Sequence, residues 1–263
     1  MDRITKAVER AKKAANQHDV VPIASSEPSG NIVADVREIS ISKDVLSRHH
    51  IILEQKNDAF SHAYKVLRTR IWQQMRSNGW TTMGVTSANP GEGKTLTAIN
   101  LAISLALMEI KHTVILVDLD LRRPSIHDYF GFWPENGIAD YFQAQASIDD
   151  VIVDPGIGEF LMLPGNLPLQ NSSEIISSAR MQRLLRELKA RFPSRLIIFD
   201  LPPVLLTDDV LALAPSIDAF LFVVEEGGSS ANDIVRAVDL LKDVHMLGSV
   251  LNKSEHALQR NNY

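Results

Sequence analysis

Apolar residues recur at helical spacing over residues 58–77. Gly79 follows shortly after this stretch, and glycine is the residue that most often stands just past a helix end. The pattern therefore predicts a helix over 58–77, with one apolar stripe facing a core. The members of that stripe, at intervals of three or four residues, are Phe60, Tyr64, Leu67, Ile71 and Met75.

Short apolar runs predict the strands of a sheet. Runs such as TVILVDL and RLIIFDL are apolar at consecutive positions, as in parallel strands that are buried on both faces. The expected strands are 81–87, 113–119, 160–163, 195–201, 219–224 and 247–251, and the helices between them are 95–109, 178–191, 208–214 and 230–243. This alternation predicts an α/β fold, a doubly wound and mainly parallel sheet of about six to eight strands flanked by helices.

The two ends of the chain differ in pattern from this middle part. Residues 1–17 combine an apolar stripe with several basic side chains, which fits either a solvated helix or one that docks on a partner or an anionic membrane. We expect three parts: an N-terminal helix and linker over 1–36, an α/β domain over 37–252, and a polar tail over 253–263. Within the domain, 37–43 alternates and predicts a short strand that His50–Glu54 continues.

Composition narrows the function classes. The chain of 263 residues has a net charge of −5 and a pI near 5.9, which argues against nucleic acid as a partner. It contains no cysteine, so disulfides and cysteine-based zinc sites are excluded. No apolar run approaches the ~20 residues of a membrane span, and residues 1–17 lack the apolar core of a signal peptide. We therefore expect a cytoplasmic protein.

The sequence MGVTSANPGEGKT, residues 83–95, predicts a phosphate-binding loop between a strand and a helix. Its Lys94 would reach the phosphates of a nucleoside triphosphate, and the Thr95 hydroxyl would bind Mg²⁺. Ala88 stands where the usual pattern has its first glycine. An ordinary solvent loop is the alternative. The residues expected to bind nucleotide are Asn89, Gly91, Glu92, Gly93, Lys94, Thr95 and Leu96.

Three aspartates follow or end the predicted strands near this loop. Asp118 and Asp120 close the strand after the loop helix, and Asp200 closes the run IIFD. Carboxylates at the carboxyl ends of neighbouring strands are the groups that orient Mg²⁺ beside a triphosphate. One of them could also accept a proton from an attacking hydroxyl, but the sequence does not say which. The alternative is that they are ordinary strand-terminal residues.

The segments SANPGEGKT, VILVDLDLRRP and IIFDLPPVLLTDD, in this order, resemble the Walker A, A′ and B motifs of the bacterial tyrosine kinases. The resemblance extends over about residues 58–252 and includes LPGNLPLQNSSEIISSARMQRLL. It implies ATP and Mg²⁺ as cofactors, Lys94, Asp118, Asp120 and Asp200 as catalytic residues, and Thr95, Asp118 and Asp200 at the metal. Arg122 and Arg123 match the A′ arginines, which implies contact with phosphate or a neighbouring subunit; a solvated turn before Pro124 is the alternative.

The resemblance also implies partners. Family members work with membrane polysaccharide co-polymerases of the chain-length determinant type, which implies such a partner in trans, a homo-oligomer, and recruitment to the inner face of the membrane. They carry phosphorylated tail tyrosines, which points to Tyr263, the last residue here. Their loop-preceding helix has a Glu-x-x-Arg-x-x-Arg pattern, where this chain has His62, Lys65 and Arg68.

Three functions remain open on this basis. The first is a protein-tyrosine autokinase that regulates exopolysaccharide or capsule polymerisation and export, and the second is an ATP-driven switch without tyrosine transfer. The third is a partitioning ATPase, disfavoured because Pro90 occupies the place of that class's additional lysine. Asn252, after the last strand, either contacts the nucleotide base or belongs to a strand-end turn.

Overall fold

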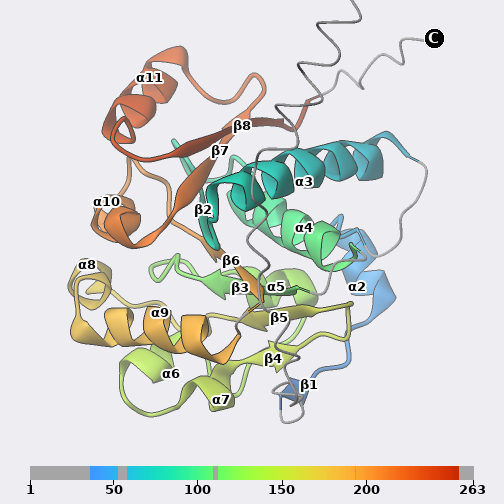
Figure 1. The fold of residues 1–263 in the computed structure, drawn as a ribbon, viewed down its shortest axis with the longest axis vertical. Helices are drawn as coiled ribbons and strands as arrows, with labels where there is room; N and C mark the ends of the chain where they lie inside the picture. The colour runs from blue at the N-terminus through green and yellow to red at the C-terminus, as the bar shows by residue number, and fades with distance from the viewer. Residues whose placement is uncertain (1–35, 53–57, 109–111, 193, 255–263) are drawn as a thin grey trace, which may run out of the picture. The chain divides into compact units, whose positions relative to one another are not determined.

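The computed structural model describes residues 36–52, 58–108, 112–192 and 194–254, and their main feature is one eight-stranded sheet (Figure 1). Its strand order is β1-β4-β5-β3-β6-β2-β7-β8. All neighbours pair in parallel except β4 and β5. The predicted doubly wound, mainly parallel sheet is therefore confirmed. The strands are β1 (Arg37–Glu38), β2 (Thr82–Ser87), β3 (Thr113–Asp118), β4 (Val153–Asp154), β5 (Phe160–Leu163), β6 (Arg195–Asp200), β7 (Ala219–Glu225) and β8 (Met246–Asn252).

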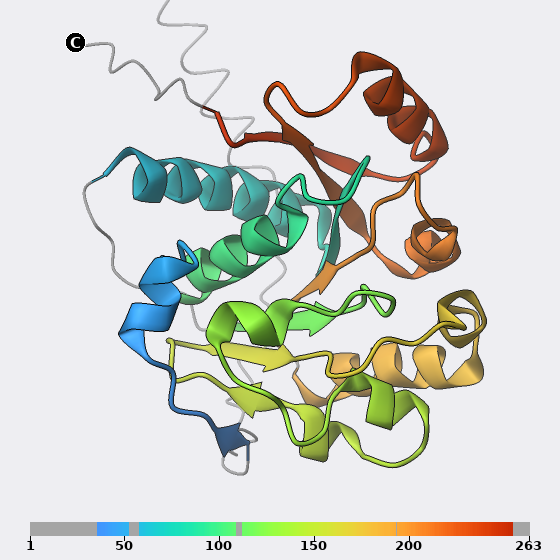
Figure 2. The same cartoon turned by 180° about the vertical axis from the view of Figure 1, so that it is seen from behind.

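Helices cover both faces of the sheet and enclose a separate apolar core on each (Figures 1 and 2). One core lies under α2 (Lys43–Arg48), α3 (Ala59–Asn78), α4 (Lys94–Ala106) and α5 (Ile126–Phe130). The other core involves α6 (Ile138–Phe142), α7 (Ile148–Val151), α8 (Ser172–Ile176), α9 (Ala179–Arg191), α10 (Asp209–Leu213) and α11 (Ala231–Leu240).

Strand β6 contributes side chains to both cores. Ile197 and Phe199 belong to one core, while Leu196 and Ile198 belong to the other, because successive side chains of a strand point to opposite faces. Gly84 of the adjacent β2 has no room for a side chain, since a Cβ there would lie 2.6 Å from Leu201 Cδ1. The side chains of Leu201 and Phe220 occupy that space. Because β3, β6, β2 and β7 pair in parallel, their carboxyl ends meet at one edge of the sheet.

The long elements confirm the periodicity. Helix α3 begins after Asp58, whose side chain accepts the backbone N–H of Ser61, and ends at Gly79 with a left-handed φ of 68°. In its predicted apolar stripe, Tyr64, Ile71 and Met75 are buried, whereas Phe60, in the first turn, is 43% exposed.

The segment before α3 corrects the prediction. Within the predicted strand 37–43, only Arg37–Glu38 forms a strand, and Lys43 at its end begins helix α2, which the sequence analysis did not predict. The Ser42 hydroxyl accepts the N–H of Asp44 and caps this helix. Residues 50–52 form no strand, which contradicts the expected continuation at 50–54 within its described part. The predicted helix at 1–17, the linker over 18–35 and most of the tail lie outside the described residues.

Candidate nucleotide-binding site

The loop between β2 and α4 forms the centre of the site. Gly91 and Gly93 adopt left-handed φ angles of 83° and 91°, which glycine reaches at little cost. The side chain of Glu92 is buried under the loop, where Oε2 accepts the backbone N–H groups of Ala88 at 2.9 Å and Asn89 at 3.2 Å. Oε1 accepts the Ser229 hydroxyl at 2.6 Å. Glu92 therefore holds the loop in shape from beneath.

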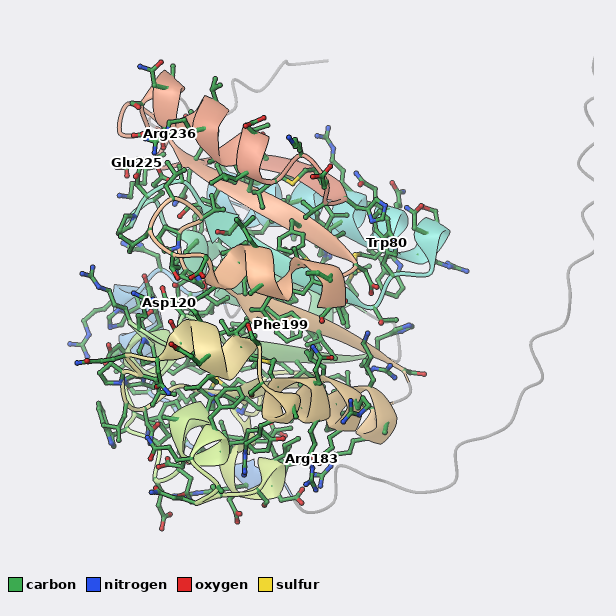
Figure 3. The ribbon with its side chains drawn as sticks, turned by 90° about the vertical axis from the view of Figure 1, so that its left-hand side faces the viewer. Trp80, Asp120, Arg183, Phe199, Glu225 and Arg236 are labelled. Atoms are coloured by element: carbon green, nitrogen blue, oxygen red, sulfur yellow. The ribbon has the colours of Figure 1, made fainter. Side chains whose placement is uncertain are left out.

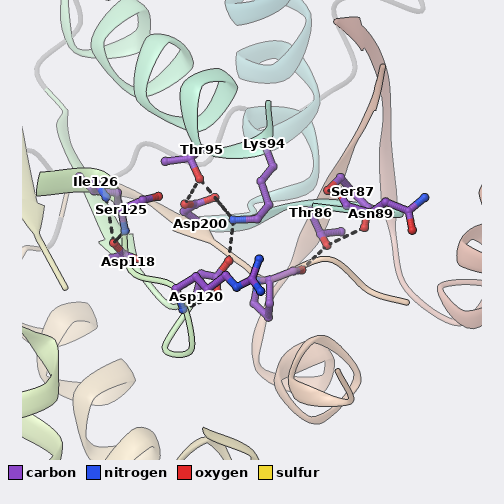
Figure 4. Close-up of polar contacts among 12 residues, drawn as sticks. Thr86, Ser87, Asn89, Lys94, Thr95, Asp118, Asp120, Ser125, Ile126 and Asp200 are labelled. Carbon is purple, nitrogen blue, oxygen red and sulfur yellow. Dashed lines mark hydrogen bonds and ion pairs between the residues drawn. The ribbon is translucent and has the colours of Figure 1, made fainter. Parts of the chain in front are cut away.

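Lys94, at the start of α4, is surrounded by acidic and hydroxyl groups (Figure 4). Its Nζ lies 2.9 Å from Asp120 Oδ2 and 3.4 Å from Asp200 Oδ1. The Thr95 hydroxyl donates to Asp200 Oδ2 at 2.6 Å. The structure thus brings together the loop lysine, the loop threonine and acids from two different strand ends, as the sequence predicts.

Asp118 lies beside this group in a different environment. Strands β3 and β6 are neighbours, and their register pairs Asp118 with Asp200. The Asp118 Oδ2 accepts the backbone N–H groups of Ser125 at 3.0 Å and Ile126 at 3.1 Å. Within the described part of the chain, its Oδ1 is buried and has no hydrogen-bond partner. A fully buried carboxylate with an unused acceptor is costly and is therefore a strong candidate to meet a ligand.

Burial and neighbouring charges shift the pKa values of Asp118, Asp200 and Lys94. Burial, and then the nearby charge of Asp200, raises the pKa of the Asp118 carboxyl to about 8. Burial also raises the pKa of Asp200, although the Lys94 charge and the Thr95 hydrogen bond oppose this. Burial alone would lower the pKa of Lys94, but the charges of Asp200 and Asp120 outweigh it and raise that pKa. Lys94 is therefore firmly cationic at neutral pH.

A cavity of about 470 Å³ opens over the loop. One part of its wall is cationic, from Lys94, Arg122 and Arg123, and another part is largely apolar. Such a cavity fits a phosphate-bearing ligand of moderate size. The complete lining is Pro90, Gly91, Gly93, Lys94, Thr95, Asp120, Arg122, Arg123, Ser125, Tyr129, Pro202, Pro203 and Leu206.

Four residues predicted to bind nucleotide do not line this cavity. Asn89 donates its amide to Asp233 Oδ2 at 3.2 Å, and the Asn252 amide donates to the Glu92 carbonyl at 2.9 Å. Leu96 packs against an apolar core. With Glu92, these side chains hold the loop and the start of α4 in the structure, so their predicted contact with nucleotide stays a prediction.

Several cavity residues were not singled out by the sequence. Tyr129 is a half-buried residue of α5, and Pro202, Pro203 and Leu206 follow β6. The two prolines stand directly after the Asp200-containing strand, and this position is the signal that could have placed them at the site. Tyr129 carries no comparable signal, because α5 is too short for its periodicity to show.

The oxygen-rich donor set fits Mg²⁺, which prefers carboxylate and hydroxyl oxygens together with substrate phosphates. Thr95 and Asp200 already touch each other, and the unused Oδ1 of Asp118 belongs to the strand beside β6. Within residues 36–254, apart from the gaps given above, no group of three or more metal-binding side chains forms a site of its own. Any Mg²⁺ here would depend on phosphate oxygens for the rest of its coordination.

Two further predictions concern the tail tyrosine and membrane-spanning helices. Tyr263, the expected phosphosite, falls outside the described residues. Among those that are described, no helix has both the length and the apolar character needed to cross a membrane.

No family model matches the chain, but known sequences include relatives that are named tyrosine-protein kinases. Tyrosine-protein kinase YwqD of Bacillus subtilis is 28% identical over 209 residues, 79% of this chain and 86% of YwqD. Tyrosine-protein kinase etk of Escherichia coli K12 is 28% identical over 205 residues, 77% of this chain. The chain spans only 28% of the length of etk.

Solved structures agree with these relatives. The chimerical protein CapA2B2 matches with a TM-score of 0.71 and 25% identity over 82% of this chain and 92% of that one. The kinase domain of Escherichia coli ETK matches with a TM-score of 0.66 and 25% identity over 84% and 92%. A Mycobacterium smegmatis cobyrinic acid a,c-diamide synthase with ATP analogue and magnesium has a TM-score of 0.51 at 20% identity, over 66% and 77%, and shares the fold. With the phosphate loop and its three aspartates, these likenesses show that the chain is similar in sequence and in fold to bacterial tyrosine kinases.

Proposed function

We propose that this chain is an ATP- and Mg²⁺-dependent tyrosine autokinase that regulates the polymerisation and export of exopolysaccharide or capsule. The observation that carries the proposal is the contact of Lys94 with both Asp120 and Asp200, with Thr95 bonded to Asp200. Lysine, hydroxyl and carboxylates are the groups that phosphoryl transfer requires around a triphosphate.

Different residues of the site would bind phosphate, bind Mg²⁺ and accept the proton. The Lys94 ammonium and the N-terminal end of α4 favour the negative charge of the phosphates. Thr95, Asp118 and Asp200 supply oxygen ligands for Mg²⁺, which when bound neutralises phosphate charge. Arg122 and Arg123 stand at the cavity wall, where guanidinium groups suit phosphate oxygens. Asp118, Asp120 and Asp200 are also the carboxylates from which the proton acceptor for a tyrosine hydroxyl would come.

The acceptor and the partner complete the proposal. The tail would present Tyr263 to a neighbouring protomer in a homo-oligomer, and the phosphate would add about −1.5 to −2 charges there. A polysaccharide co-polymerase of the membrane would recruit the chain to the inner face of the membrane. The relatives support this setting only through their family, so both the partner and the cytoplasmic location are part of the proposal.

The test is phosphotyrosine mass spectrometry of the full chain after incubation with ATP and Mg²⁺. We expect phosphate on Tyr263 in the unmodified chain, and none in Lys94→Ala, which loses the phosphate-binding cation. The same assay should be repeated with the membrane co-polymerase present. If phosphotyrosine is absent in both conditions while ATP still binds, the autokinase function is wrong.

The second candidate, an ATP-driven switch, is favoured by one contact. Arg68, the residue of α3 that retains the family's arginine, donates to the Ser104 carbonyl at 2.7 Å near the end of α4. It thus satisfies a helix end of its own chain, while the other two motif positions hold His62 and Lys65. Polysaccharide output separates the candidates: full output in Tyr263→Phe, with loss in Lys94→Ala, would favour the switch.

A further inference from the structure

Arg122 reaches the cavity wall but is anchored from behind. Its Nε donates to the Ser172 hydroxyl at 2.8 Å and lies 3.9 Å from Asp209 Oδ2. Within the described part of the chain, the two terminal nitrogens of the guanidinium make no hydrogen bond, and the side chain is 44% exposed. One edge of the group is therefore held by protein, and the remaining donors are free for a ligand.

Asp209 is the buried half of this arrangement. Its side chain is fully buried at the start of α10. Oδ1 accepts the Ser173 hydroxyl at 2.9 Å, while Oδ2 has no hydrogen bond within the described residues and faces Arg122. A carboxylate removed from water needs a nearby cation. In the described chain, Arg122 is the cation that forms an ion pair with it.

The two residues that hold Arg122, Ser172 and Asp209, come from two different helices. Ser172 and Ser173 open α8, Asp209 opens α10, and these two helices pack against each other. Ser172 is fully buried. The neighbouring Asp208 accepts the Ser173 hydroxyl at 2.6 Å but is exposed. The pair of aspartates therefore offers one buried residue aimed at Arg122 and one solvent-facing residue in nearly the same place.

We propose that Asp209, together with Ser172, is a positioning residue that aims the free guanidinium nitrogens of Arg122 at the phosphates of the bound nucleotide. The inference rests on the proposed ATP site and assigns a role to the second aspartate of LPPVLLTDD, which acts only through Arg122. A guanidinium held at Nε presents its remaining donors in a fixed plane, and such pre-orientation spares the entropy of ordering a long side chain on binding.

The test measures Mg²⁺-dependent ATP binding by the full chain in Asp209→Asn, with Asp208→Asn as the matched control. Asparagine keeps the size of Asp209 but removes the charge that orients Arg122. We expect about tenfold weaker ATP binding in Asp209→Asn and a change of less than about twofold in the control. Thermal unfolding of both variants reports whether the fold is retained.

A double-mutant cycle separates positioning from a general structural role. If Asp209 acts through Arg122, then Asp209→Asn has no further effect on ATP binding in an Arg122→Ala background. Equal weakening in both backgrounds, or no weakening in the single variant, would overturn the inference. Failure of the unmodified chain to bind ATP would overturn the ATP site itself, whereas ATP binding without phosphotyrosine would overturn only the kinase function.

Discussion

Carboxylates lie at both ends of the central strands, and their surroundings differ. At the amino end, Asp218 precedes β7, and its Oδ2 accepts the N–H of Thr81, the N–H of Thr82 and the Thr82 hydroxyl, all within 2.9 Å. At the carboxyl end, Asp118 keeps a buried oxygen without a partner in the described chain. Figure 3 labels Trp80 and Asp120 at these two opposite ends of the sheet.

The difference extends to titration. Burial would raise the pKa of Asp218, but its hydrogen bonds from Thr81 and Thr82 outweigh this and lower the pKa. Burial raises the pKa of Asp118 and Asp200 at the other end. Asp218 takes its hydrogen bonds from the strand it holds, whereas Asp200 contacts Lys94 and Thr95, the residues expected to bind phosphate and Mg²⁺. The comparison therefore distinguishes structural from functional acids by which groups they contact and by whether burial raises their pKa.

The largest expected effect is that of Asp200→Asn. Phosphotyrosine formation should fall at least about a hundredfold, because the Mg²⁺-facing charge is lost. Thermal stability should not fall, because a carboxyl with a raised pKa is costly to bury in its charged form, and Lys94 keeps its contact with Asp120. If Asp200→Asn lowers the unfolding free energy as much as Asp218→Asn does, the distinction between the two carboxylates is wrong.

An intermediate effect is expected for Asp218→Asn, which removes a charge-assisted acceptor that joins β2 to β7. We expect a loss of about 1 kcal/mol of unfolding free energy at pH 7, reduced by the partial exposure of the group. ATP binding should be unchanged, since the cavity lies at the other end of the sheet. Chemical denaturation and nucleotide titration measure the two properties separately.

The pH dependence of that loss has a definite sign. Because the folded-state pKa of Asp218 is lower than its ordinary value of 3.8, its contribution is present above pH 3.8 and disappears as the pH falls through the folded-state value. The stability difference between the two proteins should therefore shrink in acid. A difference that stays constant down to pH 2 would show that the hydrogen-bonded charge is not its cause.

The smallest effect, and the sharpest test of the comparison, is expected for Glu92→Gln. Glu92 lies at the functional end, yet its oxygens accept from loop N–H groups and the Ser229 hydroxyl, whereas the partners of Asp200 are Lys94 and Thr95. We therefore expect it to behave like a structural acid, with a loss of at most about 1 kcal/mol in stability and only a few-fold weaker ATP binding. A loss of activity as large as that of Asp200→Asn would contradict this classification.

The sequence predicted the regular parts of the molecule well. Long apolar runs and the 58–77 stripe gave the strands and helices, because burial on a face leaves a repeating pattern. Helices α5 to α8, each of five residues or fewer, were missed because one turn or so carries no measurable period. Helix α2 (Lys43–Arg48) was also missed, and the strand predicted over 37–43 is reduced to Arg37–Glu38.

The sequence by itself determined which residue types form the site: a glycine-rich loop, its lysine and threonine, and acids after apolar strands. Only the tertiary structure decided where these side chains lie relative to one another. Insertion of β6 between β3 and β2 places Asp200 beside Asp118 and within reach of Lys94. Packing of α8 against α10 sets Ser172 and Asp209 behind Arg122. Strand order and helix packing join residues far apart in the chain, and no local pattern encodes those distances.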